Sequence, residues 1–118
     1  MNLIKVGDTQ IAELDADGPI VRSEADALDL LGEIYGSDAD LIALPLARVD
    51  ASFFDLKSGL LGAVTQKFAN YGVRLAVIGD ISERVAASNA LRDYVYEANK
   101  GGRILFVNDM DALRKRLG

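Results

Sequence analysis

The fold is decided by Leu41-Ile42-Ala43-Leu44, an unbroken apolar run of the kind found in β-strands that are buried on both faces of a sheet. Two similar runs follow, at residues 74–78 and 104–107. The segments between them carry apolar residues at helical spacing, which predicts parallel strands joined by right-handed crossovers through helices. The later strands are therefore predicted to form a parallel sheet.

The first residues predict an antiparallel hairpin at the edge of this sheet. Residues 3–6 are apolar except for Lys5, Gly7-Asp8 offers a turn, and residues 10–14 alternate between polar and apolar side chains. The complete prediction is an α/β fold in the order β-β-α-β-α-β-α-β-α. It forms a single domain over residues 1–118, with a mainly parallel sheet and an antiparallel edge hairpin.

Capping residues and apolar stripes indicate where the helices lie. Helices are expected from the cap Ser23 to Gly36, over residues 56–71, from the cap Ser88 to Gly101 and after the cap Asp109, with a loop at residues 82–87. The first helix is expected to turn its apolar stripe toward the core, because these residues recur at helical spacing: Ala27, Leu28, Leu31, Ile34 and Tyr35.

The composition excludes several classes of chemistry. The 118 residues include no histidine and no cysteine, which rules out Ser-His-Asp and Cys-His catalysis, disulfides and metal sites built on these two residue types. Neither a dinucleotide fingerprint nor a P-loop occurs, so no cofactor is predicted. The net charge of −5 argues against a nucleic-acid partner. No apolar run approaches the roughly 20 residues that span a membrane, so a cytoplasmic protein is expected.

Several motifs in the second half of the chain resemble a bacterial family known as a domain of unknown function. They are Phe53-Phe54-Asp55-Leu56-Lys57-Ser58-Gly59, Gln66-Lys67-Phe68-Ala69-Asn70-Tyr71, Ala76-Val77-Ile78-Gly79-Asp80, Leu91-Arg92-Asp93-Tyr94 and Glu97-Ala98-Asn99-Lys100-Gly101. The resemblance implies no reaction. Members of that family often carry polar residues, including a histidine, around positions 45 to 48, where this chain has Pro45-Leu46-Ala47-Arg48.

The order of elements also resembles the STAS-like domains, the fold of anti-sigma-factor antagonists. In those antagonists a phosphorylatable serine lies at the start of a helix, beside an aspartate and before a glycine and a leucine. Asp55, Ser58, Gly59 and Leu60 occupy comparable positions here, although Leu56-Lys57 separates the acid from the hydroxyl. The resemblance implies a regulatory module whose Ser58 can be phosphorylated.

Three groups of residues are candidate sites, and each also has an ordinary structural interpretation. Lys57, Ser58 and Gly59 at a helix start can receive an anion, or Ser58 and Asp55 can simply cap the helix while Gly59 and Gly62 allow close packing. Asp50, Asp55 and Asp80 can form an acidic pocket for Mg²⁺, or Asp80 can end its strand in a turn by bonding its own backbone. Arg92, Tyr96 and Asn99 share a helix face that can bind a partner or remain solvated.

These features lead to a main hypothesis and two alternatives. The main one is a non-enzymatic regulatory or protein-interaction module that binds a partner or an anion through Asp55, Lys57, Ser58, Gly59, Asp80, Arg92, Tyr96 and Asn99. The first alternative is a small-ligand or metal-binding protein, or a carboxylate enzyme, that uses Asp55, Asp80 and Arg92. The second is a homodimer formed through the edge strand at residues 3–6 or an apolar helix face.

Overall fold

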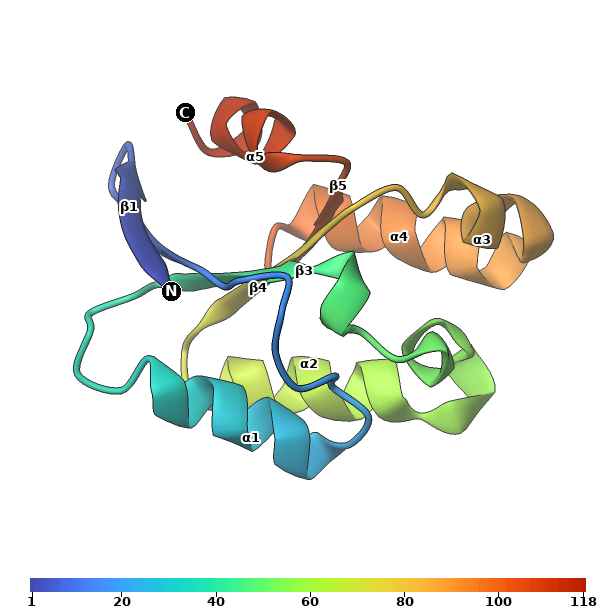
Figure 1. Ribbon diagram of the computed structural model, residues 1–118. Coiled ribbons are helices and arrows are strands. Elements are labelled where there is room, and N and C mark those ends of the chain that lie inside the picture. Colours follow the sequence, from blue (N-terminus) through green and yellow to red (C-terminus); the bar gives the residue numbers. More distant parts are fainter.

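The computed structural model describes residues 1–118 and contains a single five-stranded sheet (Figure 1). The spatial order of the strands, β1-β2-β3-β4-β5, follows their order in the chain. The strands are β1 (Asn2–Val6), β2 (Thr9–Glu13), β3 (Leu41–Pro45), β4 (Arg74–Ile78) and β5 (Ile104–Val107). β1 and β2 pair antiparallel around the turn at Gly7-Asp8, and the remaining pairs are parallel. The predicted α/β fold with an antiparallel edge hairpin is confirmed.

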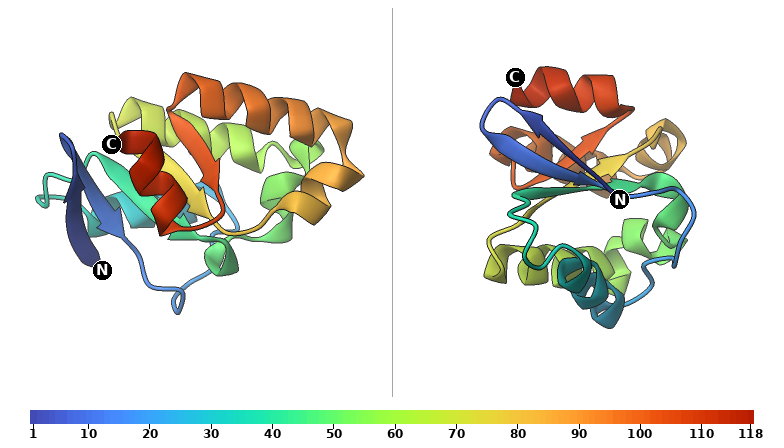
Figure 2. Two further views of the ribbon diagram at one scale, coloured as in Figure 1. Left: turned by 90° about the horizontal axis from the view of Figure 1, so that it is seen from above. Right: turned by 60° about the vertical axis from the view of Figure 1, so that its left-hand side comes forward.

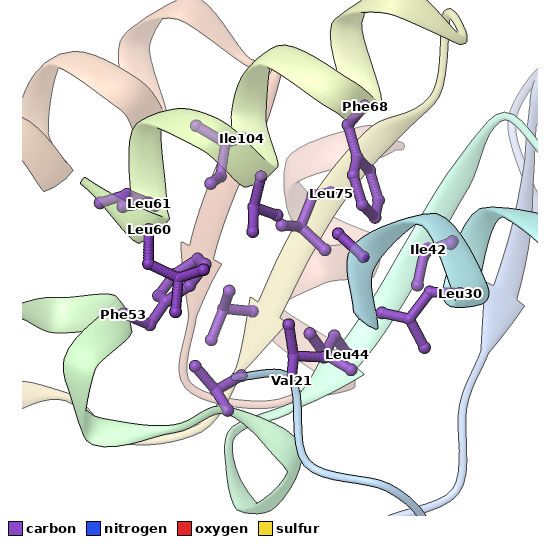
Figure 3. Close-up of a cluster of buried hydrophobic side chains, with 14 of the residues drawn as sticks. Val21, Leu30, Ile42, Leu44, Phe53, Leu60, Leu61, Phe68, Leu75 and Ile104 are labelled. Atoms are coloured by element: carbon purple, nitrogen blue, oxygen red, sulfur yellow. The ribbon is translucent and has the colours of Figure 1, made fainter. Parts of the chain in front are cut away.

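The helices divide unequally between the two faces of the sheet (Figure 2). They are α1 (Glu24–Glu33), α2 (Leu60–Asn70), α3 (Ser82–Ala87), α4 (Asn89–Gly101) and α5 (Met110–Leu117). α1, α2 and α4 cover one face and enclose a core of 22 buried residues, part of which Figure 3 shows. α5 covers the other face, where Leu113 packs into a core of six residues. The three connections between parallel strands thus all run over the face that α1, α2 and α4 cover. This arrangement follows from the right-handedness of such connections, because successive strands are added in one direction across the sheet.

The helix predicted over residues 56–71 is wrong at its start. α2 begins at Leu60, and three short 3-10 helices fill the segment before it: η1 (Leu46–Arg48), η2 (Ala51–Phe54) and η3 (Leu56–Ser58). The interruption has a backbone cause, because Gly59 adopts a left-handed conformation with φ 75° between η3 and α2. Leu56 therefore lies outside the apolar stripe of α2 and is exposed.

Two other local predictions are corrected. Residues 82–87, predicted as a loop, form α3, which packs beside α4. α1 ends at Glu33 rather than near Gly36, so Tyr35 lies beyond the helix and is 93% exposed, and Leu28 is also exposed. The caps Ser23, Ser88 and Asp109 are confirmed, since each side chain accepts a hydrogen bond from a first-turn N–H group. None of the helices is long and apolar enough to span a bilayer.

Candidate functional site

Apolar packing closes the carboxyl ends of β3 and β4, at the edge where α/β sheets commonly bind ligands. β3 runs directly into η1, whose Leu46 packs on the backbone at the end of β4. Contact is so close that a Cβ atom on Gly79 would lie 2.5 Å from the Cβ of Leu46. Phe53 of η2 and Ile81 after β4 are buried beside this edge. The space directly above the ends of β3 and β4 is therefore occupied by Leu46.

The three aspartates of the predicted acidic pocket act separately, each in its own turn. Asp50 and Asp55 accept the N–H groups of the residues two positions later at 3.0 and 3.1 Å, and Asp80 does so at 2.9 Å. No group of three or more histidine, cysteine, aspartate or glutamate side chains is placed to hold a metal ion. The geometry therefore supports the turn interpretation of Asp80, shows the same kind of bond at Asp50 and Asp55, and gives no support to a Mg²⁺ site.

Hydrogen bonding in these turns lowers two carboxyl pKa values below the ordinary 3.8. The side-chain hydroxyl of Ser52, followed by its backbone N–H, lowers the pKa of Asp50. The backbone N–H of Ser82, followed by its hydroxyl, lowers the pKa of Asp80. Both turns are thus tied to the ionised form of the aspartate, because a protonated carboxyl is a weaker acceptor.

We predict that the Asp80 turn loses its stabilising effect only under acid conditions. A carboxyl with a lowered native pKa stabilises the fold above its unfolded pKa, and the effect disappears as the pH falls through the native value. Unfolding free energies of wild type and Asp80→Asn should therefore differ near pH 6, and the difference should shrink as the pH falls below 3.8. Asp93→Asn, on an exposed part of α4, is the control. A constant difference between wild type and Asp80→Asn from pH 6 to pH 2 would contradict the linkage.

Ser58 links η3, η2 and the start of α2. Its Oγ donates to the carbonyl of Ser52 at 2.6 Å and accepts the N–H of Leu60 at 3.2 Å. Lys57 and Gly59 are exposed on the same turn, and a Cβ atom on Gly59 or Gly62 would contact nothing within 4 Å. The capping interpretation of Ser58 is thus supported, whereas the idea that these glycines permit close helix packing is wrong.

A groove connects this loop with the junction of α3 and α4. We call it the Phe54 groove; it has a volume of about 270 Å³ and is lined by Ala51, Phe54, Asp55, Arg84, Ala87, Ser88 and Leu91. The guanidinium carbon of Arg84 lies 4.7 Å from the centre of the Phe54 ring. Phe54 in turn contacts the rings of Phe53 and Phe106, with centroids 5.4 and 6.4 Å away. The groove therefore has a fixed aromatic floor beneath a cation.

Sequence analysis identified Asp55 in this groove and missed Phe54 and Arg84. Of the three residues proposed for a small-ligand site, only Asp55 lines the groove; Asp80 and Arg92 do not. Phe54 is buried by the rings behind it, and Arg84 belongs to a segment predicted as a loop. Their contact joins residues 30 positions apart, and no periodicity in the sequence signals such a pair.

The predicted face of α4 separates into an exposed part and a structural part. Tyr96 is 64% exposed, with the Lys100 ammonium 5.5 Å from its ring centre, and Arg92 pairs with Asp93 at 3.5 Å. Asn99 instead turns to β5. Its Oδ1 accepts the N–H of Phe106 at 2.8 Å and its Nδ2 donates to the carbonyl of the same residue at 3.3 Å. Asn99 therefore caps a sheet edge and is unavailable as a partner residue.

Removing this edge cap should destabilise the domain measurably. Asn99→Ala leaves the half-buried N–H and C=O of Phe106 without a protein partner, so we predict a loss of about 1–3 kcal/mol in the free energy of unfolding. Urea denaturation measures the loss, and amide hydrogen exchange at Phe106 should accelerate. Asn89→Ala, at an exposed site on the same helix, is the control. Equal effects of the two substitutions would refute the assigned role.

Comparison with known proteins relates the chain to a protein family. The model of a family described as "Domain of unknown function (DUF4180)" matches residues 6–117, nearly the whole chain. No curated protein and no solved structure matches the chain.

Proposed function

We propose that this chain, which belongs to the DUF4180 family, is a non-enzymatic module that binds a partner protein in the Phe54 groove. The observation that carries the proposal is the Arg84 guanidinium lying over the Phe54 ring, with Asp55 also lining the groove. Arginine and aromatic side chains are enriched among the residues that dominate binding energy at protein interfaces. The Phe54 groove presents both kinds of side chain, and the Phe54 ring is held in place by the rings of Phe53 and Phe106.

The surroundings of the groove also favour a macromolecular partner. Its apolar lining comes from Ala51, Phe54, Ala87 and Leu91, and its charged groups from Asp55 and Arg84. An apolar centre bordered by polar groups is typical of protein interfaces. The absence of histidine and cysteine removes the commonest catalytic side chains, which favours a binding module over an enzyme. A partner that inserts an apolar side chain and pairs with Arg84 and Asp55 fits this lining.

The resemblance to STAS-like regulatory modules suggests how binding could be controlled. Ser58 holds the carbonyl of Ser52 in η2, the segment that contributes Ala51 and Phe54 to the groove. Phosphorylation would remove the O–H donor and add about −1.5 to −2 charges. The η2 wall would lose this tether, so a phosphoryl group on Ser58 is expected to weaken partner binding.

Site-specific photo-crosslinking in native cell extract tests the proposal. A photoreactive amino acid at Ala87 in the groove should capture a defined protein, and the same residue at Ala25, exposed on α1, should not. Excess wild-type chain should abolish capture. Excess Arg84→Glu should fail to compete, provided that its circular dichroism and melting temperature match wild type.

Three results would overturn the proposal. They are equal capture from Ala87 and Ala25, capture that excess wild type leaves unchanged, and equal competition by wild type and Arg84→Glu. A Ser58→Asp competitor addresses the regulatory part alone, because it should compete less well than Ser58→Ala.

A further inference from the structure

Arg48 is the one charged residue buried in the fold. It belongs to η1, between β3 and the bridge that Val49 makes with Val21, and it is 4% exposed. No carboxylate lies within 4.0 Å of its guanidinium. Burying a cation without an anionic partner costs several kcal/mol of folding free energy, so Arg48 must gain compensating contacts from its surroundings.

The loop between β2 and α1 holds this guanidinium in place. Nε donates to the carbonyl of Pro19 at 3.1 Å, and Nη1 donates to the carbonyl of Asp15 at 3.4 Å. Gly18 of the same loop has φ 154°, and a Cβ atom there would lie 2.8 Å from the guanidinium carbon. The carbonyl of Arg48 accepts the N–H of Val21 at 2.7 Å. Both ends of the arginine are therefore fixed before any ligand arrives.

One nitrogen of Arg48 remains available. Nη2 donates to no protein acceptor, unlike Nε and Nη1. No fully buried side-chain nitrogen or oxygen in the fold lacks a partner, which means that Nη2 is reached from outside. Arg48 lines a cavity of about 160 Å³, and this is where a ligand can approach it. A cavity needs only about 10–15 Å³ to hold a water molecule, so this one admits a molecule of several atoms.

The rest of the cavity has the opposite charge. Asp29 and Glu33 of α1 line it and take part in no ion pair, whereas Asp26 already accepts the N–H of Arg22 at 2.9 Å. Apolar walls come from Pro19, Ile20, Val21 and Leu30. The cavity thus combines a fixed guanidinium, two free carboxylates and an apolar lining. A phosphate or another dianion would meet repulsion from the two carboxylates.

We propose that this cavity binds a free amino acid, with its carboxylate on Arg48 and its ammonium group at Asp29 and Glu33. Guanidinium and carboxylate form strong charge-assisted hydrogen bonds, and the ligand supplies the anion that Arg48 lacks. The apolar walls accommodate a small aliphatic side chain. The site shares no residue with the Phe54 groove, so either can fail without the other.

A screen of the individual free L-amino acids by melting temperature, followed by calorimetry, tests this site. At least one small aliphatic amino acid, such as L-valine, should bind. Isobutylamine lacks the carboxylate and 3-methylbutanoate lacks the amine, and each should bind at least tenfold more weakly than L-valine. Inorganic phosphate should produce no shift. Amide resonances of Val21 and Leu30 should move on binding, and that of Ala87 should not.

Substitutions then distinguish a ligand-binding role of this cavity from a purely structural role of Arg48. Asp29→Asn/Glu33→Gln changes two exposed side chains and should weaken amino-acid binding at least tenfold, while Glu97→Gln on α4 should not. The proposal is overturned if no amino acid binds wild type, if the double variant binds equally well, or if 3-methylbutanoate equals L-valine.

Discussion

Replacing Phe53 by alanine is expected to lower the free energy of unfolding by about 3–5 kcal/mol, the range for truncating a fully buried aromatic side chain. Phe53 is 0% exposed and meets the Phe54 ring edge-on, at an interplanar angle of 74°. Figure 3 shows it beside Leu60 at the start of α2. The segment from η1 to η3 has no regular strand or α-helix of its own, so this side chain is its main anchor in the core.

Chemical denaturation measures this effect against a matched control. The midpoint of Phe53→Ala should fall strongly with little change in slope, because the same surface is exposed on unfolding. Leu56→Ala, three residues later and 36% exposed, should cost no more than about 1.5 kcal/mol, since it buries only part of its side chain. If the two variants lose equal stability, Phe53 is not the anchor. Because Phe53 supports Phe54, its loss should also disturb the groove.

Gly79→Ala is expected to cost at least about 2 kcal/mol, through backbone strain and overpacking together. The residue has φ 154°, and the new methyl group would lie 2.5 Å from the Cβ of Leu46. Shortening Leu46 to alanine would leave that Cβ in place, so the clash can be relieved only by moving η1 away from β4. The substitution should therefore also loosen Arg48, two residues after Leu46.

A second glycine with positive φ provides a comparison in which no neighbouring atom opposes the new methyl group. Gly36 has φ 83°, and a Cβ atom there would meet nothing within 4 Å. Gly36→Ala should thus lose stability through backbone strain alone, and Gly79→Ala should exceed it by at least about 1 kcal/mol. Thermal and urea unfolding of the two variants provide the comparison. Equal losses would show that η1 moves aside without cost.

The sequence was sufficient to predict the strands, because apolar runs with helical segments between them have few alternative arrangements. The runs at residues 41–44, 74–78 and 104–107 all lie within buried strands. Helix ends were harder to predict. Gly59 was expected inside a helix, but its positive φ separates η3 from α2. Glycine adopts either sign of φ, and the sequence does not indicate which one it takes.

The candidate sites were predictable only where the local sequence determines the chemistry. Asp55, Asp80 and Ser58 form their hydrogen bonds within six residues of themselves, as the capping and turn interpretations anticipated. Arg48 was noted only as a departure from the family pattern. Its burial depends on a loop about 30 positions earlier in the chain. Such a contact follows from tertiary packing, so residue type and spacing alone do not reveal it.

The side-chain cap that Asn99 places on β5 has a consequence for polymerisation. The N–H and C=O of Phe106 face away from β4 and are already bonded to Asn99, so a new strand cannot use them. β1 forms the other end of the sheet and has no partner beyond it. If copies join β1 to β1 about a two-fold axis, each uses the sheet edge that no side chain caps in this way. Further extension of the sheet would then have to use β5, where Asn99 occupies the groups of Phe106.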